Sequence, residues 1–305
     1  MNDKVKISVL TSLYHCEQYL EDFFHYLSEI KGVNQIEMLL LHNDPQENEM
    51  QIINRWLPEM PFVRHILIPE RETLYRSWNR GIMLSQGEYI TVWNVDDVRF
   101  PDSILQQADA LDKNPEAAIA YGDIWISETY GDRDGYCTNS PTNNHNKIFL
   151  KRYHISCFQM WRKSIHDTIG YYDEQFKCVA DFDFQIRSAL HFPFVKTAEP
   201  LGIYLEGHPD KLSYNGFSEI ERNVIYLRYG VYQYLNIFLF PKAKKLYVPN
   251  KLLFFDNQQD FTEQTPFGKG YKTAGAICAF FTSIYWLCKQ IAKKILYGSK
   301  LMRRK

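Results

Sequence analysis

The sequence predicts an α/β fold in which a mostly parallel β-sheet carries helices on both faces. Short apolar runs alternate with helical patterns from residue 5 to residue 121. Such alternation implies right-handed crossovers between parallel strands. The run at residues 89–95 is apolar and uncharged, as expected for a central strand that is buried on both faces. It ends in Asp96 and Asp97, at the kind of strand end where ligands gather in these sheets.

The individual elements follow from the spacing of the apolar residues. A first strand is expected at residues 5–10, and apolar residues at helical spacing predict a helix over 17–30. Further strands are expected at 36–41, 63–68, 89–95 and 117–121, and further helices at 50–57, 74–84 and 101–113.

The second half of the chain is less regular. Residues 132–147 are rich in Gly, Asp, Asn, Thr and Pro, which predicts a long surface loop of the kind that often faces substrate. Strand character resumes at 158–161, and a helix is expected to begin at 180–183. Asp181 and Asp183 lie in its first turn, where acidic residues are also common partners of the helix dipole.

Two domains are expected, a catalytic domain over residues 1–235 and a C-terminal extension with a helical tail over 236–305. Residues 275–288 carry no charge, and the charged residues that follow them are all Lys or Arg. This run is shorter than the roughly 20 residues of a spanning helix, so we expect a basic amphipathic helix that lies on a membrane of anionic lipid. The alternative is a terminal helix that packs on the catalytic domain and leaves its basic end in solvent.

Composition narrows the class of protein. Lys and Arg (35) nearly balance Asp and Glu (36), so nucleic acid is not an expected partner. The six cysteines show no paired spacing, which predicts reduced, mostly buried thiols. The amino terminus lacks the pattern of a signal peptide. The expected location is therefore cytoplasmic, and peripheral on the cytoplasmic face of a membrane.

The paired carboxylates Asp96 and Asp97 predict a metal and nucleotide site. Two hard oxygen ligands side by side suit Mg²⁺ or Mn²⁺ shared with a phosphate ligand, because such a cation usually takes only one or two protein carboxylates. The alternative is a turn at the strand end, held by bonds from the Asp side chains to the backbone.

The order of these segments resembles the family 2 glycosyltransferases of the GT-A type, over about residues 5–213. The matching segments are ISVLTSLY at 7–14, EMLLLHND at 37–44, SWNRGI at 77–82, GEYI at 87–90, NVDD at 94–97, and GYYDE with ADFD at 170–174 and 180–183. The resemblance implies a GT-A-type, Rossmann-like fold. It also implies metal-dependent transfer, of the hexosyltransferase type and with inversion, from a nucleotide-diphospho-sugar such as a UDP-sugar.

The resemblance also assigns roles to residues. Asp181 matches the catalytic base, a carboxylate that takes the proton of the attacking acceptor hydroxyl. The matched positions further predict a Mn²⁺ or Mg²⁺ site and a donor site. The metal ligands would be Asp96, Asp97 and His208, and the donor contacts Ser12, Tyr14, Asn43, Asp44, Asn79 and Asp96. In the alternative interpretation Ser12 caps a turn, Tyr14 is half-buried packing, and His208 is structural.

Three positions depart from the family pattern. Asn94 replaces the first acid of the common Asp-x-Asp motif, so either metal affinity is weaker or the two remaining aspartates suffice. Ala180 replaces the usual Glu beside the base. An ungapped match puts His42 and Asn43 at the paired acids of the base-binding loop, whereas a shift of one residue puts Asn43 and Asp44 there.

The leading hypothesis is a glycosyltransferase that acts on a glycan or lipid-linked acceptor in surface polysaccharide biosynthesis. A second hypothesis, motivated by Asn94 and Ala180, is a sugar-nucleotide-binding or assembly protein without catalysis. A third is another α/β enzyme with paired aspartates, such as a phosphatase or nucleotidyltransferase. The sequence has neither the P-loop motif nor the dinucleotide-binding glycine motif.

Overall fold

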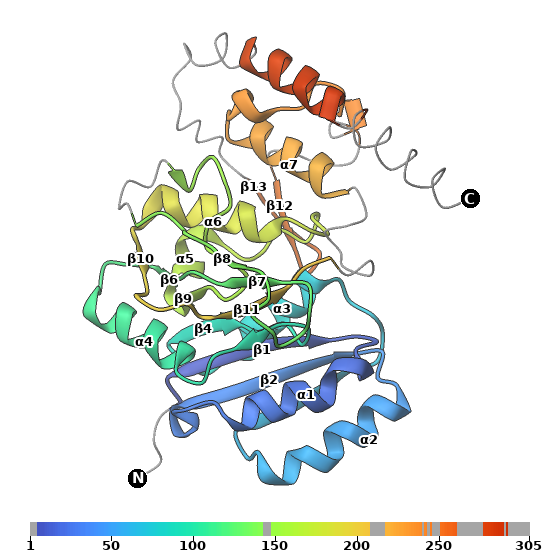
Figure 1. Ribbon diagram of the computed structural model, residues 1–305, viewed down its shortest axis with the longest axis vertical. Coiled ribbons are helices and arrows are strands. Elements are labelled where there is room, and N and C mark those ends of the chain that lie inside the picture. Colours follow the sequence, from blue (N-terminus) through green and yellow to red (C-terminus); the bar gives the residue numbers. More distant parts are fainter. Residues whose placement is uncertain are drawn as a thin grey trace. The chain divides into compact units, whose positions relative to one another are not determined.

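The chain folds into two compact units in a computed structural model (Figure 1). The structure describes residues 5–142, 148–207, 217–239, 241–242, 245, 251–260, 277–289 and 291, with the backbone alone at 258–260. The first unit comprises Met1–Lys211 and Phe254–Asn257, and the second comprises Leu212–Leu253 and Gln258–Lys305. The division into functional domains expected at residue 235 stays a prediction.

A seven-stranded sheet forms the centre of the first unit, in the order β10-β6-β9-β4-β1-β2-β3. Its strands are β1 (Ile7–Leu13), β2 (Ile36–Asn43), β3 (Val63–Ile68), β4 (Tyr89–Val92), β6 (Ile119–Tyr121), β9 (Met160–Arg162) and β10 (Phe194–Lys196). All neighbours pair in parallel except β9, which runs antiparallel to both β4 and β6. The mostly parallel α/β sheet predicted from the sequence is confirmed.

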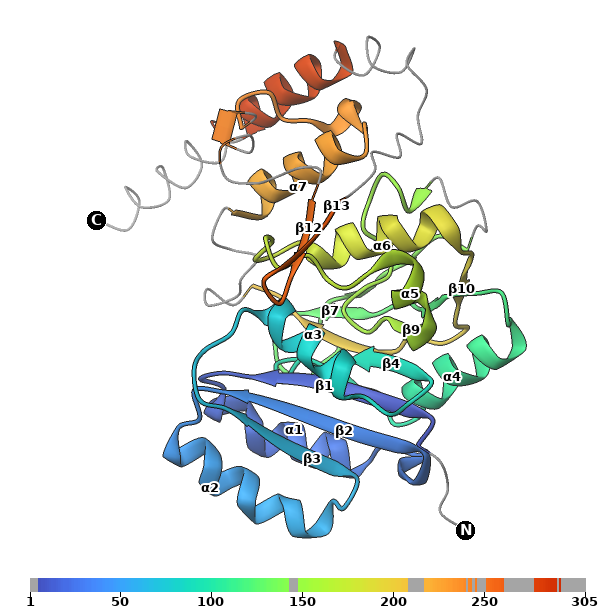
Figure 2. The same ribbon diagram turned by 180° about the vertical axis from the view of Figure 1, so that it is seen from behind.

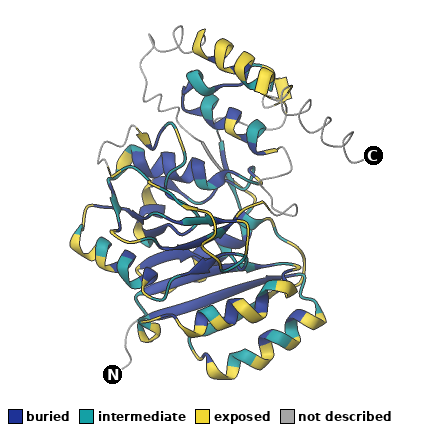
Figure 3. Cartoon of the chain, viewed as in Figure 1, coloured by how far each residue is buried: buried dark blue, intermediate teal, exposed yellow. Residues whose placement is uncertain are grey.

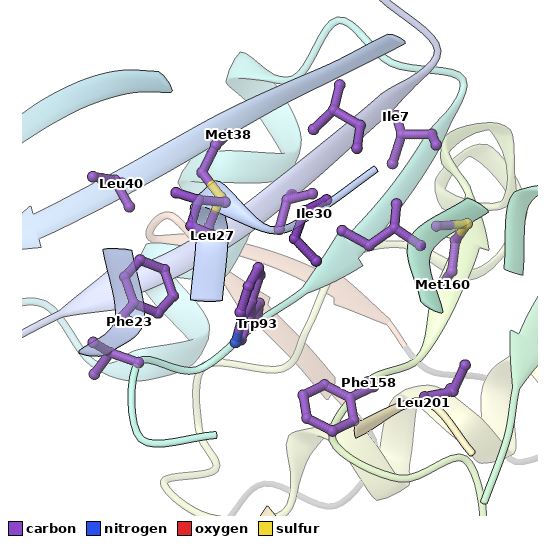
Figure 4. Packing of buried hydrophobic residues seen from close by; sticks show 14 of the residues in the cluster. Ile7, Phe23, Leu27, Ile30, Met38, Leu40, Trp93, Phe158, Met160 and Leu201 are labelled. Carbon is purple, nitrogen blue, oxygen red and sulfur yellow. The ribbon is translucent and has the colours of Figure 1, made fainter. Parts of the chain in front are cut away.

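Helices cover both faces of this sheet. Successive side chains of a strand point to opposite faces, so the apolar strands present side chains that must be buried on each face. Val9 belongs to the core that the sheet shares with three helices, and this core includes Phe23, Leu27 and Trp93 (Figure 4). These helices are α1 (Glu17–Ser28), α2 (Glu47–Trp56) and α4 (Ser103–Lys113). Leu10 points to the other face, where its side chain lies against Gly81 of α3 (Leu74–Leu84). The strands of this sheet are mostly buried, except for the edge strand β3, and exposed residues lie mainly on the outer sides of the helices (Figure 3).

A second, four-stranded sheet holds the segment that follows β4. It has the order β5-β11-β7-β8 and consists of β5 (Val98–Arg99), β11 (Gly202–Leu205), β7 (Trp125–Ser127) and β8 (Tyr136–Cys137). β11 approaches β5 so closely that a Cβ at Gly202 would lie 2.2 Å from the Val98 carbonyl oxygen. β8, a strand of two residues, lies within the long loop predicted over residues 132–147.

Helix starts and ends mostly agree with the predictions. α6 (Ala180–His191) begins where the sequence predicts, and the short α5 (His166–Ile169) precedes it. α2 begins three residues earlier than predicted, because a carboxylate oxygen of Glu49 accepts the Gln46 backbone N–H (3.3 Å) and so completes the first turn. β1 is shifted towards the carboxyl end of the predicted range and reaches Leu13.

The C-terminal region contributes α7 (Phe217–Arg228), the strands β12 (Lys251–Phe254) and β13 (Asn257–Asp260), and a helix over residues 277–289. None of the described helices has the length and apolar character needed to cross a membrane. All six cysteines are free, but only Cys16 is fully buried, and Cys278 and Cys288 are exposed. The prediction of mostly buried thiols was therefore wrong, since the last two cysteines lie on the outer side of the helix at 277–289.

Candidate active site

The carboxyl ends of three neighbouring strands form one edge of the central sheet. β1 lies between β2 and β4 and is parallel to both, so Ser12, Asn43 and the segment after Val92 meet at this edge. Trp93 is tied to β1 here, because its backbone N–H donates to the Leu10 carbonyl (3.0 Å) and its carbonyl accepts from Thr11 Oγ1 (2.7 Å). Ligands in open α/β sheets bind at this kind of edge.

Asn43 connects three elements at this edge. Its Oδ1 accepts the Glu72 backbone N–H (3.0 Å), while Nδ2 lies within hydrogen-bonding distance of Ser12 Oγ (3.2 Å) and Ser77 Oγ (3.0 Å). The amide is buried, so its polar atoms hold the ends of β1 and β2 against α3. Asp44, which follows at φ 47°, is partly exposed. Of this pair, Asp44 is therefore the one whose side chain solvent can reach.

Tyr14 lies beside an arginine that the sequence did not indicate. The Arg71 guanidinium lies 4.0 Å from the centre of the Tyr14 ring, and its NH1 donates to the Tyr14 hydroxyl (3.3 Å). Arg71 is exposed, so it adds positive charge to the edge where Tyr14 and Asp44 lie. An isolated arginine in a loop carries no periodic or motif signal, which is why the sequence alone did not reveal it.

Asp96 and Asp97 lie in different environments although they are adjacent. Asp97 is 1% exposed; its Oδ1 accepts the Leu205 backbone N–H (3.3 Å), and its Oδ2 accepts from Asn94 Nδ2 (3.1 Å). It therefore joins the turn after β4 to β11. Asp96 is partly exposed. The turn held by Asp side chains, considered above as an alternative, is present at Asp97.

The side chains at this edge permit a cation that Asp96 shares with a diphosphate. Among the residues that the structure describes, no group of three or more His, Cys, Asp and Glu side chains could by itself hold a metal ion. A cation shared with a diphosphate needs only one or two protein carboxylates, which Asp96 can supply with or without Asp97. His208 lies outside the described residues, so its role as a ligand stays a prediction.

The first turn of α6 presents Asp181 to two tyrosines. Asp181 is partly exposed, and its Oδ1 accepts from the Tyr75 hydroxyl of α3 (3.4 Å) and from the Phe182 backbone N–H (2.9 Å). Burial, followed by the charge of Asp181, raises the pKa of Tyr153 well above its ordinary value. Tyr153 thus stays protonated beside the carboxylate. Neither tyrosine belongs to a recognisable motif, so sequence reasoning missed both.

A buried hydrogen-bond network supports these tyrosines. The Tyr153 hydroxyl lies 2.6 Å from the Ser156 carbonyl and 3.2 Å from Gln159 Oε1. Gln159 Nε2 donates to the Tyr172 hydroxyl (3.2 Å). Burial raises the pKa of Tyr172. Gln159 itself lies beside β4, because its carbonyl accepts from Thr91 Oγ1 (2.8 Å). The network therefore connects the surroundings of Asp181 to the central sheet.

Asn79 and Asp183 hold the segment that precedes α6. Asn79 is buried; its Nδ2 donates to the Tyr172 carbonyl and its Oδ1 accepts the Tyr172 N–H, both at 2.9 Å. Asp183 forms a buried ion pair with Arg187 (2.8 Å), whose NH2 donates to the Tyr171 carbonyl (2.8 Å). Both side chains position the backbone that leads to Asp181. Contact of Asn79 with a nucleotide stays a prediction.

The tip of the β12–β13 hairpin lies next to α3 (Figure 2). Arg76, which follows Tyr75 on α3, joins this tip to the segment before α6. It forms ion pairs with Glu174 (3.3 Å), Glu72 (3.6 Å) and Asp256 (3.5 Å), and its guanidinium lies 5.3 Å from the centre of the Phe255 ring. The tip therefore adds Phe255 and the exposed Asp256 to the first unit, beside the helix that carries Tyr75.

A hollow of about 660 Å³ lies at the opposite edge of the sheet. Its lining includes Lys6 and Gly87, which lie at the amino ends of β1 and β4, together with Lys163 and Tyr171. Because ligands of such sheets bind at the carboxyl ends of the strands, we do not assign the donor to this hollow.

Comparison with known proteins identifies relatives by sequence. The model of glycosyl transferase family 2 matches residues 8–172. The PGL/p-HBAD biosynthesis glycosyltransferases of Mycobacterium bovis and Mycobacterium tuberculosis are 22% identical over 193 residues, which cover 62% of this chain and 69% of each relative.

Solved structures share the fold. TarS 1-349 of S. aureus, solved in complex with UDP-GlcNAc, has a TM-score of 0.59 at 13% identity, over 73% of this chain and 64% of that chain. The mannosyltransferase PcManGT of Pyrobaculum calidifontis, in complex with GDP-Man and Mn²⁺, has a TM-score of 0.54 at 11% identity, over 98% of this chain and 81% of that chain. This chain spans less than two thirds of TarS 1-349, with 65% of that chain covered in another structure of it.

Proposed function

Because the chain belongs to glycosyl transferase family 2, we propose that it transfers a sugar from a nucleotide-diphospho-sugar to a hydroxyl of a glycan or lipid-linked acceptor. The proposed donor is a UDP-sugar whose sugar is of the hexose type, in line with the UDP-GlcNAc complex of TarS. The proposed setting is surface polysaccharide or glycolipid synthesis, in line with the name of the mycobacterial relatives. The observation that carries the proposal is the shared carboxyl edge of β1, β2 and β4, to which α3 joins the first turn of α6.

Asp181 is proposed as the catalytic base. As the acceptor oxygen forms a bond to the anomeric carbon, the bond from that carbon to the diphosphate oxygen breaks, and the hydroxyl proton passes to the Asp181 carboxylate. Attack from the face opposite the leaving diphosphate inverts the anomeric centre. Tyr75 orients the carboxylate through its hydroxyl group, and the protonated Tyr153 lies close to it.

The donor is proposed to bind along the strand ends. Tyr14 offers a ring face to the base, Ser12 and Asp44 offer polar groups to the base or ribose, and Arg71 offers positive charge to the diphosphate. Asp96 and Asp97 are proposed to hold Mn²⁺ or Mg²⁺, with His208 as a further ligand. When bound, the cation would offset the negative charge that develops on the leaving diphosphate.

The proposed location is the cytoplasmic face of a membrane, to which the protein attaches peripherally. A lipid-linked acceptor would be presented there. The basic, acid-free C-terminal sequence supports this location.

A thermal-shift screen of nucleotide sugars, with and without Mn²⁺, tests the donor site. A ligand that binds only the folded state at 100 times its Kd raises the free energy of unfolding by about 2.7 kcal/mol. We expect one UDP-sugar to raise Tm in the presence of Mn²⁺, and Asp96→Ala to abolish this shift. The absence of a shift with every nucleotide sugar would contradict the proposal.

Turnover tests the catalytic role. Asp181→Asn should keep the donor-induced shift but lower kcat about 10²- to 10⁴-fold. Asp109→Asn on the exposed side of α4 is the matched control and should transfer at the parent rate. Donor binding by the parent without transfer or donor hydrolysis would favour the second hypothesis, a sugar-nucleotide-binding protein that has lost catalysis.

A further inference from the structure

The helix at residues 277–289 belongs to the second unit and packs against the rest of that unit through its small side chains. Ala279 and Ser283 are each 1% exposed and lie four residues apart, on one face of the helix. Ser283 Oγ accepts the Ile237 backbone N–H (3.0 Å) and donates to the Ala279 carbonyl (2.6 Å). Thr282 Oγ1 donates to the Gln233 carbonyl (3.4 Å). The contacts that fix this helix are thus made by small and polar groups.

The large apolar side chains of the same helix point outward. Phe280 is 51% exposed, Phe281 65% and Tyr285 70%. Other exposed apolar residues continue the surface at helical spacing, and we call the whole set the apolar face: Ile277, Phe280, Phe281, Ile284, Tyr285, Leu287 and Ile291. A helix on a water-soluble surface normally turns its large apolar residues inward, so this helix has the reverse arrangement. A continuous exposed apolar surface of this kind marks an interaction site.

The sequence around the apolar face indicates what covers it. Every charged residue from 264 to 305 is Lys or Arg. Lys289 directly follows Cys288 at the end of the uncharged stretch, and six further basic residues follow within 290–305. Apolar and aromatic side chains beside such a basic run match the two layers of a bilayer surface, the acyl boundary and the anionic headgroups. A protein partner would have to supply an acidic and an apolar surface together.

We propose that the apolar face inserts into the interfacial layer of a bilayer that contains anionic lipid. Phe280, Phe281 and Ile284 enter the acyl boundary, and Tyr285 lies at the headgroup level, where aromatic rings with a polar group are favoured. The basic residues after Cys288 bind anionic headgroups. Attachment to a bilayer also favours a lipid-linked acceptor for the proposed sugar transfer. Only this statement about the acceptor rests on the proposed function.

Vesicle co-sedimentation of the full chain tests the proposal. The probes are vesicles of phosphatidylcholine alone and of phosphatidylcholine with 30% phosphatidylglycerol. We expect the parent to bind the anionic vesicles at least tenfold more strongly than the neutral ones, and this preference to shrink in 0.5 M NaCl. We expect the double variant Phe280→Glu/Phe281→Glu to lose at least tenfold in binding to anionic vesicles. Met83→Glu, a substitution of a similarly exposed residue on α3, is the matched control and should bind like the parent.

Three outcomes overturn the proposal: parent-like binding by the double variant, the same loss in the Met83→Glu control, or absence of vesicle binding by the parent. If the parent forms a dimer that the double variant abolishes, and binds no vesicles, the apolar face is a self-association surface instead. Circular dichroism with the thermal midpoint verifies that the variants are folded. The nucleotide-sugar shift, measured without vesicles, should be the same in parent and double variant. If the parent binds vesicles but binds no nucleotide sugar, the proposed function is contradicted and this inference stands.

Discussion

At the scale of single residues, two neighbouring aspartates have separate tasks because the backbone turns between them. Asp97 points into the protein and accepts two hydrogen bonds, whereas Asp96 remains accessible to solvent. Asp97 thus fixes the turn, in addition to its proposed part in the metal site, whereas Asp96 is the carboxylate that solvent reaches at the ligand edge. The turn that Asp97 fixes is the turn that carries Asp96.

Substitution should separate these two tasks. Asp97→Ala leaves the buried Leu205 N–H and the Asn94 amide without their acceptor, and we expect it to lower the free energy of unfolding by about 1–3 kcal/mol. Asp96→Ala should change it by less than about 0.5 kcal/mol, as is usual for accessible sites. Urea unfolding at pH 7 measures both. Equal losses in the two variants would refute the division of roles.

The tyrosines on Asp181 allow a second prediction. A hydroxyl that donates to a carboxylate favours its charged form, so removal of the donor makes the carboxylate easier to protonate. Tyr75→Phe should therefore shift the acid limb of the pH–rate profile to higher pH and lower kcat, with little change in donor affinity. The profile of kcat against pH measures this shift. An unchanged acid limb would mean that Tyr75 only packs against Tyr172.

At the scale of elements, α3 organises the site. Its Ser77 contacts Asn43, its Tyr75 contacts Asp181, and its Asn79 holds the backbone of Tyr172. One helix thus connects the nucleotide-facing strand ends with the segment that leads to the base. Displacement of this helix would disturb both halves of the site together.

Asn79→Ala tests this connection. The buried Tyr172 N–H loses its acceptor, which should cost about 1–3 kcal/mol of folding stability. Hydrogen exchange of residues 170–180 should accelerate, since this segment loses its anchor to α3. Asn48→Ala, at an exposed position of α2, is the control and should leave exchange in this segment unchanged. Faster exchange throughout the chain, rather than in 170–180, would indicate a general loss of stability.

The elements that the sequence predicts well are those with local patterns. β1 to β4 and α1 to α4 alternate with clear apolar spacing, and each was expected close to its observed range. β7, β8, β10 and β11 have two to four residues each, too few for a periodic signal. They form only because partners distant in the chain pair with them, as β11 does with β5 and β7.

The same distinction applies to the site. Asp96 and Asp181 could be named from their motifs, but the role of Asp97 depends on Leu205, 108 residues away. Tyr75 and Tyr153 reach Asp181 only once α3 and the segment before β9 are packed against α6. Contacts over such separations depend on the topology and leave no local trace in the sequence.

At the scale of the whole molecule, two neutral histidines connect folding to pH. His166 Nε2 accepts from Trp161 Nε1 (2.9 Å), and Nδ1 lies 2.9 Å from the Gly170 carbonyl, so the ring must keep a lone pair on Nε2. Burial lowers the pKa of His166 from 6.5 to about 4, and burial with the charge of His42 lowers that of His65 to about 4. Protonation of His166 would remove the acceptor of the buried Trp161 N–H.

Acid should therefore unfold the protein through these groups. Below pH 6.5 the unfolded chain binds a proton at each histidine while the folded chain does not bind one until about pH 4. Their contribution to stability is complete above pH 6.5 and is lost as the pH falls towards 4. Urea unfolding at pH 7.5 and pH 5 should show a lower free energy of unfolding at pH 5. His166→Gln should reduce this difference, because glutamine does not titrate. Should the variant be too unstable to measure, proton NMR of the parent decides the matter: a His166 ring that titrates near pH 6.5 in the folded protein would refute the prediction.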